Sequence, residues 1–155
     1  MWRASEEVIP LVRAGRRGRA PVARDALPSM NDNANIDIDI VEYEDVVIVS
    51  VEGEVDLSAA RLFEESLAIA AATDVPAIVL DLDRVSFMDS AGVHVLLQFS
   101  ISEQNRDRLT LTRGSSQVQR LLQITGVRRY LSFGPSPAPE PNGRRPTERL
   151  HITSD

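Results

Sequence analysis

Two neighbouring apolar patterns mark the start of the ordered part of the chain. Along residues 36–41 isoleucine takes every second position, and a period of two is typical of a strand with one buried face. Residues 46–51 are apolar at almost every position, which predicts a strand buried on both faces. The acidic pair at 44–45 separates the two runs, so we expect a turn there.

Further strands and helices alternate after this pair. Apolar runs predict strands at 77–82 and 109–112, and a shorter run predicts an edge strand at 130–133. Apolar residues at helical spacing predict three helices, each preceded by residues that can cap it: Asp56 or Ser58, Asp89 or Ser90, and Ser115 or Ser116. The order of elements predicts an α/β fold, a mixed β-sheet with crossover helices packed against it.

Both ends of the chain lack such periodicity. Residues 1–29 are interrupted by prolines and glycines and predict a disordered N-terminal extension. Residues 134–155 open on a proline-rich run and predict a disordered tail. The folded domain is therefore expected to span 30–133, and Met30 is an alternative start of the functional protein.

Composition excludes several chemistries. The chain has no cysteine, so thiolate catalysis and cysteine-ligated metals are excluded. All 17 of its basic residues are arginines, and the missing lysine speaks against Schiff-base catalysis and against phosphate-binding loops. No apolar run approaches membrane-spanning length and the N-terminus lacks the apolar segment of a signal peptide, so we expect a cytoplasmic protein with no membrane partner.

Charge is distributed unevenly. Residues 1–29 hold six arginines against three acids, whereas residues 30–133 hold eight arginines against seventeen acids. A domain this acidic repels phosphate groups, so direct binding to nucleic acid is not expected.

The most informative segment is the junction between the strand at 77–82 and the helix that follows it. Ser90 stands where the loop becomes a helix, and its hydroxyl is expected to be exposed there. The free N–H groups and the positive dipole end of a helix start also favour an added phosphate. Ser90 is therefore a suitable place to add or remove charge, although Ser and Asp are also common caps without further function.

The helix after Ser90 carries a second set of apolar positions. Val95 and Phe99 fall roughly opposite its main apolar stripe. Packing against a neighbouring helix is one explanation, and an exposed docking patch beside Ser90 is the other.

Two catalytic or metal-binding interpretations remain alternatives. Ser90 and His94 lie one helical turn apart and would form the core of a serine hydrolase, although the first glycine of a nucleophile elbow is absent. Four acids could hold a hard cation, but solvated loop acids are the better explanation: Asp56, Asp81, Asp83 and Asp89. We expect no metal and no cofactor.

Three blocks of sequence resemble one known family. The segment 80–93 closely resembles the signature of bacterial anti-sigma-factor antagonists, which are stand-alone STAS domains. Residues 51–56 resemble the family's Gly-Glu-hydrophobic-Asp motif, and residues 109–127 resemble its C-terminal strand–helix block. Ala91 departs from the pattern, because the family often has a second Ser or Thr after the phosphoacceptor.

The resemblance implies a STAS-like fold and a non-enzymatic switch. Ser90 matches the phosphoacceptor, which is modified by a partner anti-sigma factor that is itself a serine kinase. A PP2C-type phosphatase then resets the protein, and only the unphosphorylated form binds the anti-sigma factor and frees a sigma factor. A STAS module of a signalling assembly or of a lipid-transport complex, without the switch, is the alternative within the family. The residues expected to contact the partner are Asp56, Asp89, Ala91, Gly92, Val95 and Phe99.

Overall fold

A five-stranded sheet forms one layer, and helices cover one of its faces. The computed structural model describes residues 34–137 and 145–153. The strands are ordered β4-β3-β2-β1-β5, and their bounds are β1 Ile36–Glu42, β2 Val46–Val55, β3 Ala77–Met88, β4 Leu109–Leu111 and β5 Glu148–Thr153. β1 pairs antiparallel with β2 and β5, whereas β3 pairs parallel with β2 and β4. The expected α/β fold with a mixed sheet is confirmed.

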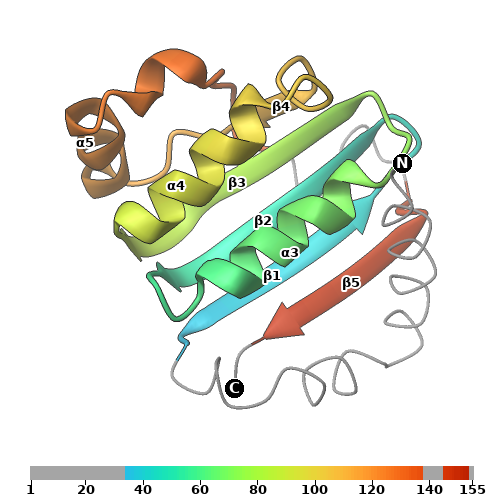
Figure 1. Ribbon diagram of the computed structural model, residues 1–155. Helices are drawn as coiled ribbons and strands as arrows, with labels where there is room; N and C mark the ends of the chain where they lie inside the picture. Colours follow the sequence, from blue (N-terminus) through green and yellow to red (C-terminus); the bar gives the residue numbers. More distant parts are fainter. Residues whose placement is uncertain (1–33, 138–144, 154–155) are drawn as a thin grey trace.

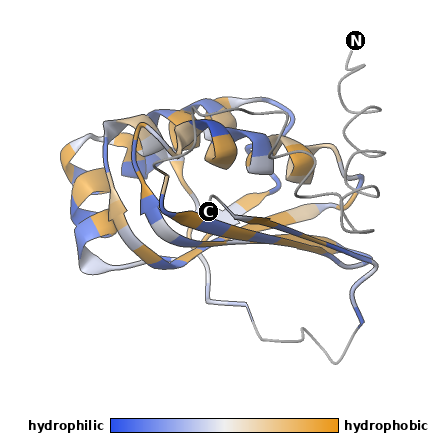
Figure 2. Cartoon of the chain, turned by 90° about the horizontal axis from the view of Figure 1, so that it is seen from below, coloured by the Kyte–Doolittle hydropathy of each residue, from blue (hydrophilic) through white to orange (hydrophobic). Residues whose placement is uncertain are grey.

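The helices lie together on one side of this sheet. Helices α3 (Ala60–Ala71) and α4 (Ser90–Ile101) run side by side across it (Figure 1). Seen along the sheet, the opposite face carries no helix among the described residues (Figure 2). Helix α5 (Ser116–Ile124) and the short 3-10 helix η3 (Val127–Tyr130) follow β4. Fully buried side chains from sheet and helices form the core between the layers, among them Ile38, Val49, Phe63, Leu80 and Leu96.

Strands β2 and β3 are longer than their apolar runs predict. β2 continues to Val55 and β3 to Met88, through segments that we expected to be loops. Their pairing accommodates register shifts on either side of Glu52–Gly53. Gly53 has φ of 108°, and a Cβ there would lie 2.3 Å from the backbone oxygen of Asn35, so only glycine fits. The extra length places both strand ends at one edge of the molecule.

Two expectations about the C-terminal part are wrong. Residues 130–133 form no edge strand, because η3 takes up the first of them and only Phe133 bridges to Leu111 of β4. The tail is not disordered throughout, because residues 148–153 form β5 along the free edge of β1. The expected disorder of 1–29 and the alternative start at Met30 lie outside the described residues.

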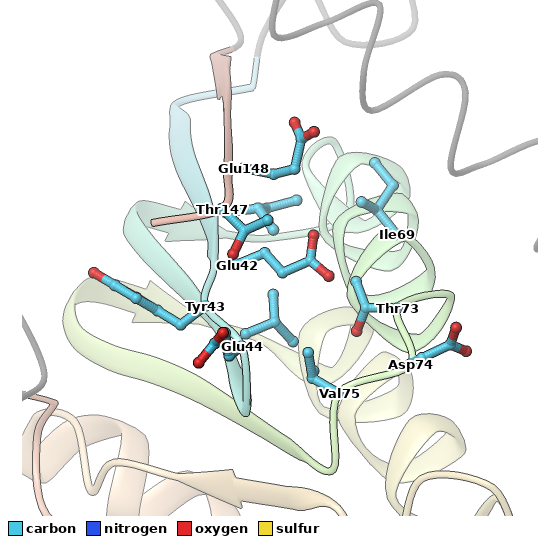
Figure 3. A pocket seen from close by; sticks show the side chains of 11 residues that line it. Glu42, Tyr43, Glu44, Ile69, Thr73, Asp74, Val75, Thr147 and Glu148 are labelled. Atoms are coloured by element: carbon cyan, nitrogen blue, oxygen red, sulfur yellow. The ribbon is translucent and has the colours of Figure 1, made fainter. Parts of the chain in front are cut away.

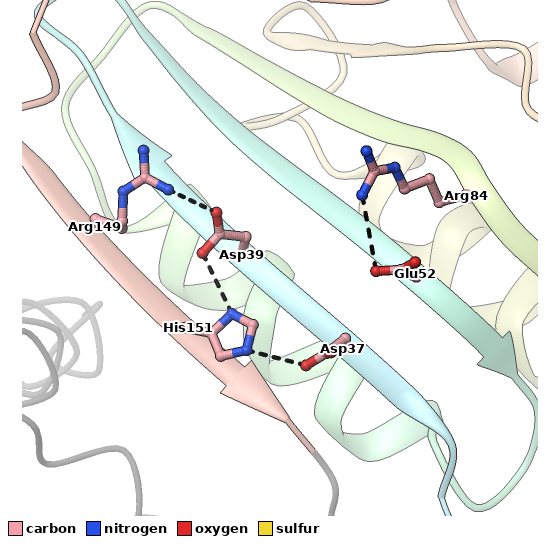
Figure 4. Close-up of polar contacts among 6 residues, drawn as sticks. All are labelled: Asp37, Asp39, Glu52, Arg84, Arg149 and His151. Carbon is pink, nitrogen blue, oxygen red and sulfur yellow. Dashed lines mark hydrogen bonds and ion pairs between the residues drawn. The ribbon is translucent and has the colours of Figure 1, made fainter. Parts of the chain in front are cut away.

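β5 is held by one buried leucine and by exposed contacts between side chains of β5 and β1. Leu150 is 6% exposed and belongs to the core cluster. On the opposite face Arg149 Nη1 lies 3.0 Å from Asp39 Oδ2, and His151 Nε2 lies 3.1 Å from Asp37 Oδ1 (Figure 4). Exposed pairs of this kind contribute at most about 1 kcal/mol each, so burial of Leu150 is the larger stabilising contribution.

Replacing Leu150 by alanine is expected to lower the free energy of unfolding by about 2–3 kcal/mol, because it removes buried methyl groups and leaves a cavity beside β1. Urea unfolding measures the change. The matched control is His151→Ala on the exposed face of the same strand, which should cost no more than about 1 kcal/mol. Equal effects of the two variants would contradict the docking of β5.

Arg108 ties the start of β4 to the end of α3. Its guanidinium donates hydrogen bonds to the backbone oxygens of Ala71, Thr73 and Val75, at 2.8–3.2 Å. Burial lowers the pKa of Arg108, and the nearby Asp74 opposes this shift. The side chain thereby satisfies carbonyl groups that the end of a helix leaves without partners.

Candidate functional site

The candidate site lies where β2 and β3 end side by side. Val55 and Met88 are paired in the parallel ladder, and the N–H of Asp89 donates to the oxygen of Val55 at 3.2 Å. The residues that follow each strand, Asp56 and Asp89, therefore emerge at the same edge of the sheet. Since both strands lead directly into helices, the starts of α3 and α4 are also brought together (Figure 1).

Asp89 caps helix α4, and this leaves Ser90 available. The Oδ1 atom of Asp89 accepts a hydrogen bond from the N–H of Ala91 at 2.9 Å. Ser90 is the first residue of the helix and its side chain is exposed. Of the two caps that the sequence allowed, the structure selects Asp89. The hydroxyl of Ser90 is consequently presented to solvent beside the free N–H groups of a helix start.

Asp56 organises the turn that leads into α3. Its Oδ1 atom accepts hydrogen bonds from the hydroxyl of Ser58 at 2.7 Å and from the N–H of Ala59 at 3.1 Å. Helix α3 begins just after this turn, at Ala60. The half-buried carboxylate of Asp56 thus has a structural role in addition to the role in recognition that we expect from the sequence.

Gly92 permits the close contact between α4 and the end of β2. A Cβ at this position would lie 2.8 Å from Val55 Cγ1 and from Met88 Cγ, and 3.0 Å from the backbone oxygen of Val55. The residue is buried, so packing within the chain explains the glycine. Ala91, by contrast, is only half-buried and remains at the surface beside Ser90.

Val95 and Phe99 pack inward. Val95 is 9% exposed and belongs to the core cluster, and the partly buried Phe99 packs against that cluster. The expectation of an exposed docking patch at these two residues is therefore wrong, and the packing interpretation is correct. The hydropathy pattern of α4 did not distinguish a docking patch from internal packing, because this helix contacts neighbours on more than one side.

The most exposed apolar residue at this edge was missed. Leu57, in the turn directly after Asp56, is 78% exposed. The sequence contained an indication of this exposure, because Leu57 is an apolar residue that stands among turn residues before a helix.

The fold and the site match a known family. Residues 37–138, most of the chain, match the STAS domain family. The chain belongs to the STAS domain family. It is 34% identical over 95 residues to the anti-sigma-B factor antagonist of Listeria monocytogenes serovar 1/2a, a match that covers 60% of this chain and 83% of that protein. It is 26% identical over 93 residues to the anti-sigma-F factor antagonist RsfB of Mycobacterium tuberculosis, covering 60% of this chain and 76% of that protein.

A solved structure agrees with this chain in fold. The anti-sigma factor antagonist from Mycobacterium paratuberculosis superposes with a TM-score of 0.56 at 24% identity, covering 65% of this chain and 86% of that one. The resemblance to stand-alone STAS domains that rested on three short blocks is therefore confirmed over most of the described domain. Strand β5 lies beyond the matched residues 37–138.

The geometry of this STAS domain gives no support to the serine hydrolase interpretation. Ser90 and His94 are both exposed on α4, and within residues 34–137 and 145–153 no hydrogen bond joins them. Asp89 accepts from the N–H of Ala91, and among the described residues no hydrogen bond joins its carboxylate to His94. A nucleophile without a positioned base lacks the activation that hydrolysis requires.

The acids that suggested a cation site are distributed along the sheet. Asp81 lies within β3, where its Oδ1 accepts from the N–H of Asp83 at 3.0 Å. Asp56 and Asp89 lie at the end of the strands, and no cluster of three potential metal ligands occurs in the described part of the chain.

A cavity of about 370 Å³ lies at the opposite end of the domain (Figure 3). Residues that line the cavity include Glu42 at the end of β1, Val47 at the start of β2, and Asp74 and Val75 in the loop after α3. β2 begins at the cavity and ends at Val55, beside the start of α4, so the length of this strand separates the cavity from the candidate site. None of the described helices is long and apolar enough to cross a membrane.

Proposed function

We propose that this STAS domain is an anti-sigma factor antagonist whose binding state is set by phosphorylation of Ser90. In the unphosphorylated form it binds an anti-sigma factor that is a serine kinase, and this releases a sigma factor. A PP2C-type phosphatase restores the unphosphorylated form. The protein acts in the cytoplasm and has no catalytic activity of its own. The observation that carries the proposal is the exposed first-turn serine whose neighbour Asp89 already caps the helix.

The position of Ser90 favours a phosphate in the free protein. Free N–H groups at a helix start donate hydrogen bonds to anions, and the helix dipole adds a favourable field. Since Asp89 rather than Ser90 caps α4, modification of the hydroxyl breaks no hydrogen bond that the helix needs. The phosphorylated protein is therefore expected to keep its fold.

The same position makes a phosphate unfavourable in a complex. A phosphate adds about −1.5 to −2 charges at pH 7. Asp56 and Asp89 already place two carboxylates at this edge, and an interface formed around a neutral hydroxyl would have to desolvate the added charge. Phosphorylation is thus expected to release the partner without unfolding the antagonist.

Intact-mass analysis after incubation with ATP and each serine-kinase anti-sigma factor from the same genome tests the proposal. We expect one added phosphate on the wild-type protein and none on Ser90→Ala. The matched control is Ser116→Ala, since Ser116 is also an exposed first residue of a helix and should leave phosphorylation unchanged. Phosphate that appears equally on Ser90→Ala, or on no protein with any of these kinases, would contradict the proposal.

A further inference from the structure

Leu57 is an exposed apolar side chain held in a defined position. At 78% exposure it is the most exposed large apolar residue in the described part of the chain. The Asp56 carboxylate closes the surrounding turn through Ser58 and Ala59. Because these hydrogen bonds already fix the backbone of the turn, a partner that covers Leu57 restricts only the rotamers of its side chain, which favours its use in binding.

Leu57 and Ser90 occupy equivalent places on neighbouring strands. Leu57 follows Val55 by two residues, and Ser90 follows Met88, the partner of Val55 in the parallel ladder, by two residues. Both therefore lie at the same edge of the sheet, and Figure 1 shows that α3 and α4 begin side by side there. The contact of Gly92 with Val55 keeps α4 close to the end of β2.

The surroundings of Leu57 are acidic. Glu54, Asp56 and Asp89 place three carboxylates along this turn and at the start of α4, and the one arginine that follows the turn, Arg61 in the first turn of α3, lies 3.7 Å from Glu65. Arg84, on β3 before this edge, lies 3.9 Å from Glu52. A partner that covers this edge must match an apolar side chain inside a negatively charged rim, which requires an apolar pocket bordered by basic residues.

We propose that Leu57 is the apolar anchor of the interface, and that it inserts into a pocket of the anti-sigma factor bordered by arginine or lysine side chains. This inference rests on the proposed function and adds to it the residue that supplies affinity. Ser90 then controls the interface because a phosphate beside the anchor adds charge at the place where water must be expelled. Asp56 contributes to orientation and to the rate of association, as charges at an interface rim generally do.

The test compares Leu57→Ala with a matched control on the same protein. The kinase that phosphorylates Ser90 serves as the binding probe, with affinity measured by calorimetry. We expect Leu57→Ala to weaken binding at least about tenfold, since truncation of an interface anchor has effects of this size. Ile124→Ala removes a leucine-sized side chain that is 71% exposed on α5 and should change affinity less than about twofold. Both side chains are exposed, so neither variant should change the urea midpoint.

The dependence of affinity on salt concentration distinguishes the contribution of Leu57 from that of the charged residues around it. Asp56→Asn keeps an oxygen that can accept from Ser58 and Ala59, but it removes one charge, so it should reduce the dependence of affinity on salt. Leu57→Ala should lower affinity at every salt concentration and leave that dependence unchanged. Wild-type binding with no loss in Leu57→Ala would overturn the anchor and leave the proposed function intact. Failure of the wild type to bind any of the kinases would overturn both.

Discussion

Ser90→Asp is expected to bind the anti-sigma factor at least about 100-fold more weakly than the wild type, while Ser90→Ala binds as well as the wild type. The aspartate places a permanent charge beside Asp56 and Asp89, and an uncompensated charge buried in an interface costs about 3–5 kcal/mol. A loss of about 3 kcal/mol corresponds to about 100-fold in affinity. Calorimetric titration of both variants at one ionic strength measures the difference.

The chain offers a closely matched control for this substitution. Ser116 is the first residue of α5, is exposed, and follows Ser115, whose side chain caps that helix by accepting from the N–H of Val118 at 3.2 Å. Ser116→Asp therefore makes the same change at the first position of a helix, but on α5 rather than on α4, where the proposed interface lies. We expect it to leave binding unchanged. If Ser90→Asp bound as tightly as Ser90→Ala, the switch would be ruled out.

Gly92→Ala is expected to lower the free energy of unfolding by about 2 kcal/mol. In an exposed helix the same change would instead stabilise by about 1 kcal/mol, because alanine favours the helix. Here the new methyl group would overlap Val55 and Met88, and the overlap includes a branched side chain and a backbone oxygen that cannot rotate away. The sign of the change therefore distinguishes packing from helix propensity.

A comparison at Gln98 isolates the contribution of helix propensity to the Gly92 measurement. Gln98 is exposed on the same helix, and Gln98→Ala should be more stable than Gln98→Gly by about 1 kcal/mol in urea unfolding. Position 92 should show the opposite order. If alanine stabilised position 92 as well, the close contact between α4 and β2 would be refuted, and the exact placement of Ser90 with it.

Local sequence predicted the chemically important part of the site. The start of α4, its capping residue among two choices and the exposure of Ser90 follow from interactions between residues one to three positions apart, such as the bond from Ala91 to Asp89. The same holds for Asp56, which accepts a hydrogen bond from the N–H of the residue three positions later, Ala59. Such contacts do not depend on distant parts of the chain, so they can be predicted from a single sequence.

Other features of the site depend on which surfaces meet. Val95 and Gly92 have the residue types of a contact surface, yet α4 is covered on more than one side and both are buried. Leu57 has the residue type of a core position, yet its turn projects from the end of the sheet. Hydropathy records what a side chain prefers, whereas exposure is decided by the packing of neighbouring elements.

The α/β order of elements, the capped helix start at Ser90 and the acidic character of the domain are local or compositional properties, so they can be predicted from the sequence. The extension of β2 and β3 to Val55 and Met88, which brings Asp56 and Ser90 to one edge, depends on the pairing of the two strands in the folded protein. The formation of β5 by residues 148–153 likewise depends on long-range pairing. β5 pairs with β1, a strand more than 100 residues earlier in the chain, and its short alternating pattern has no buried face until that strand provides one.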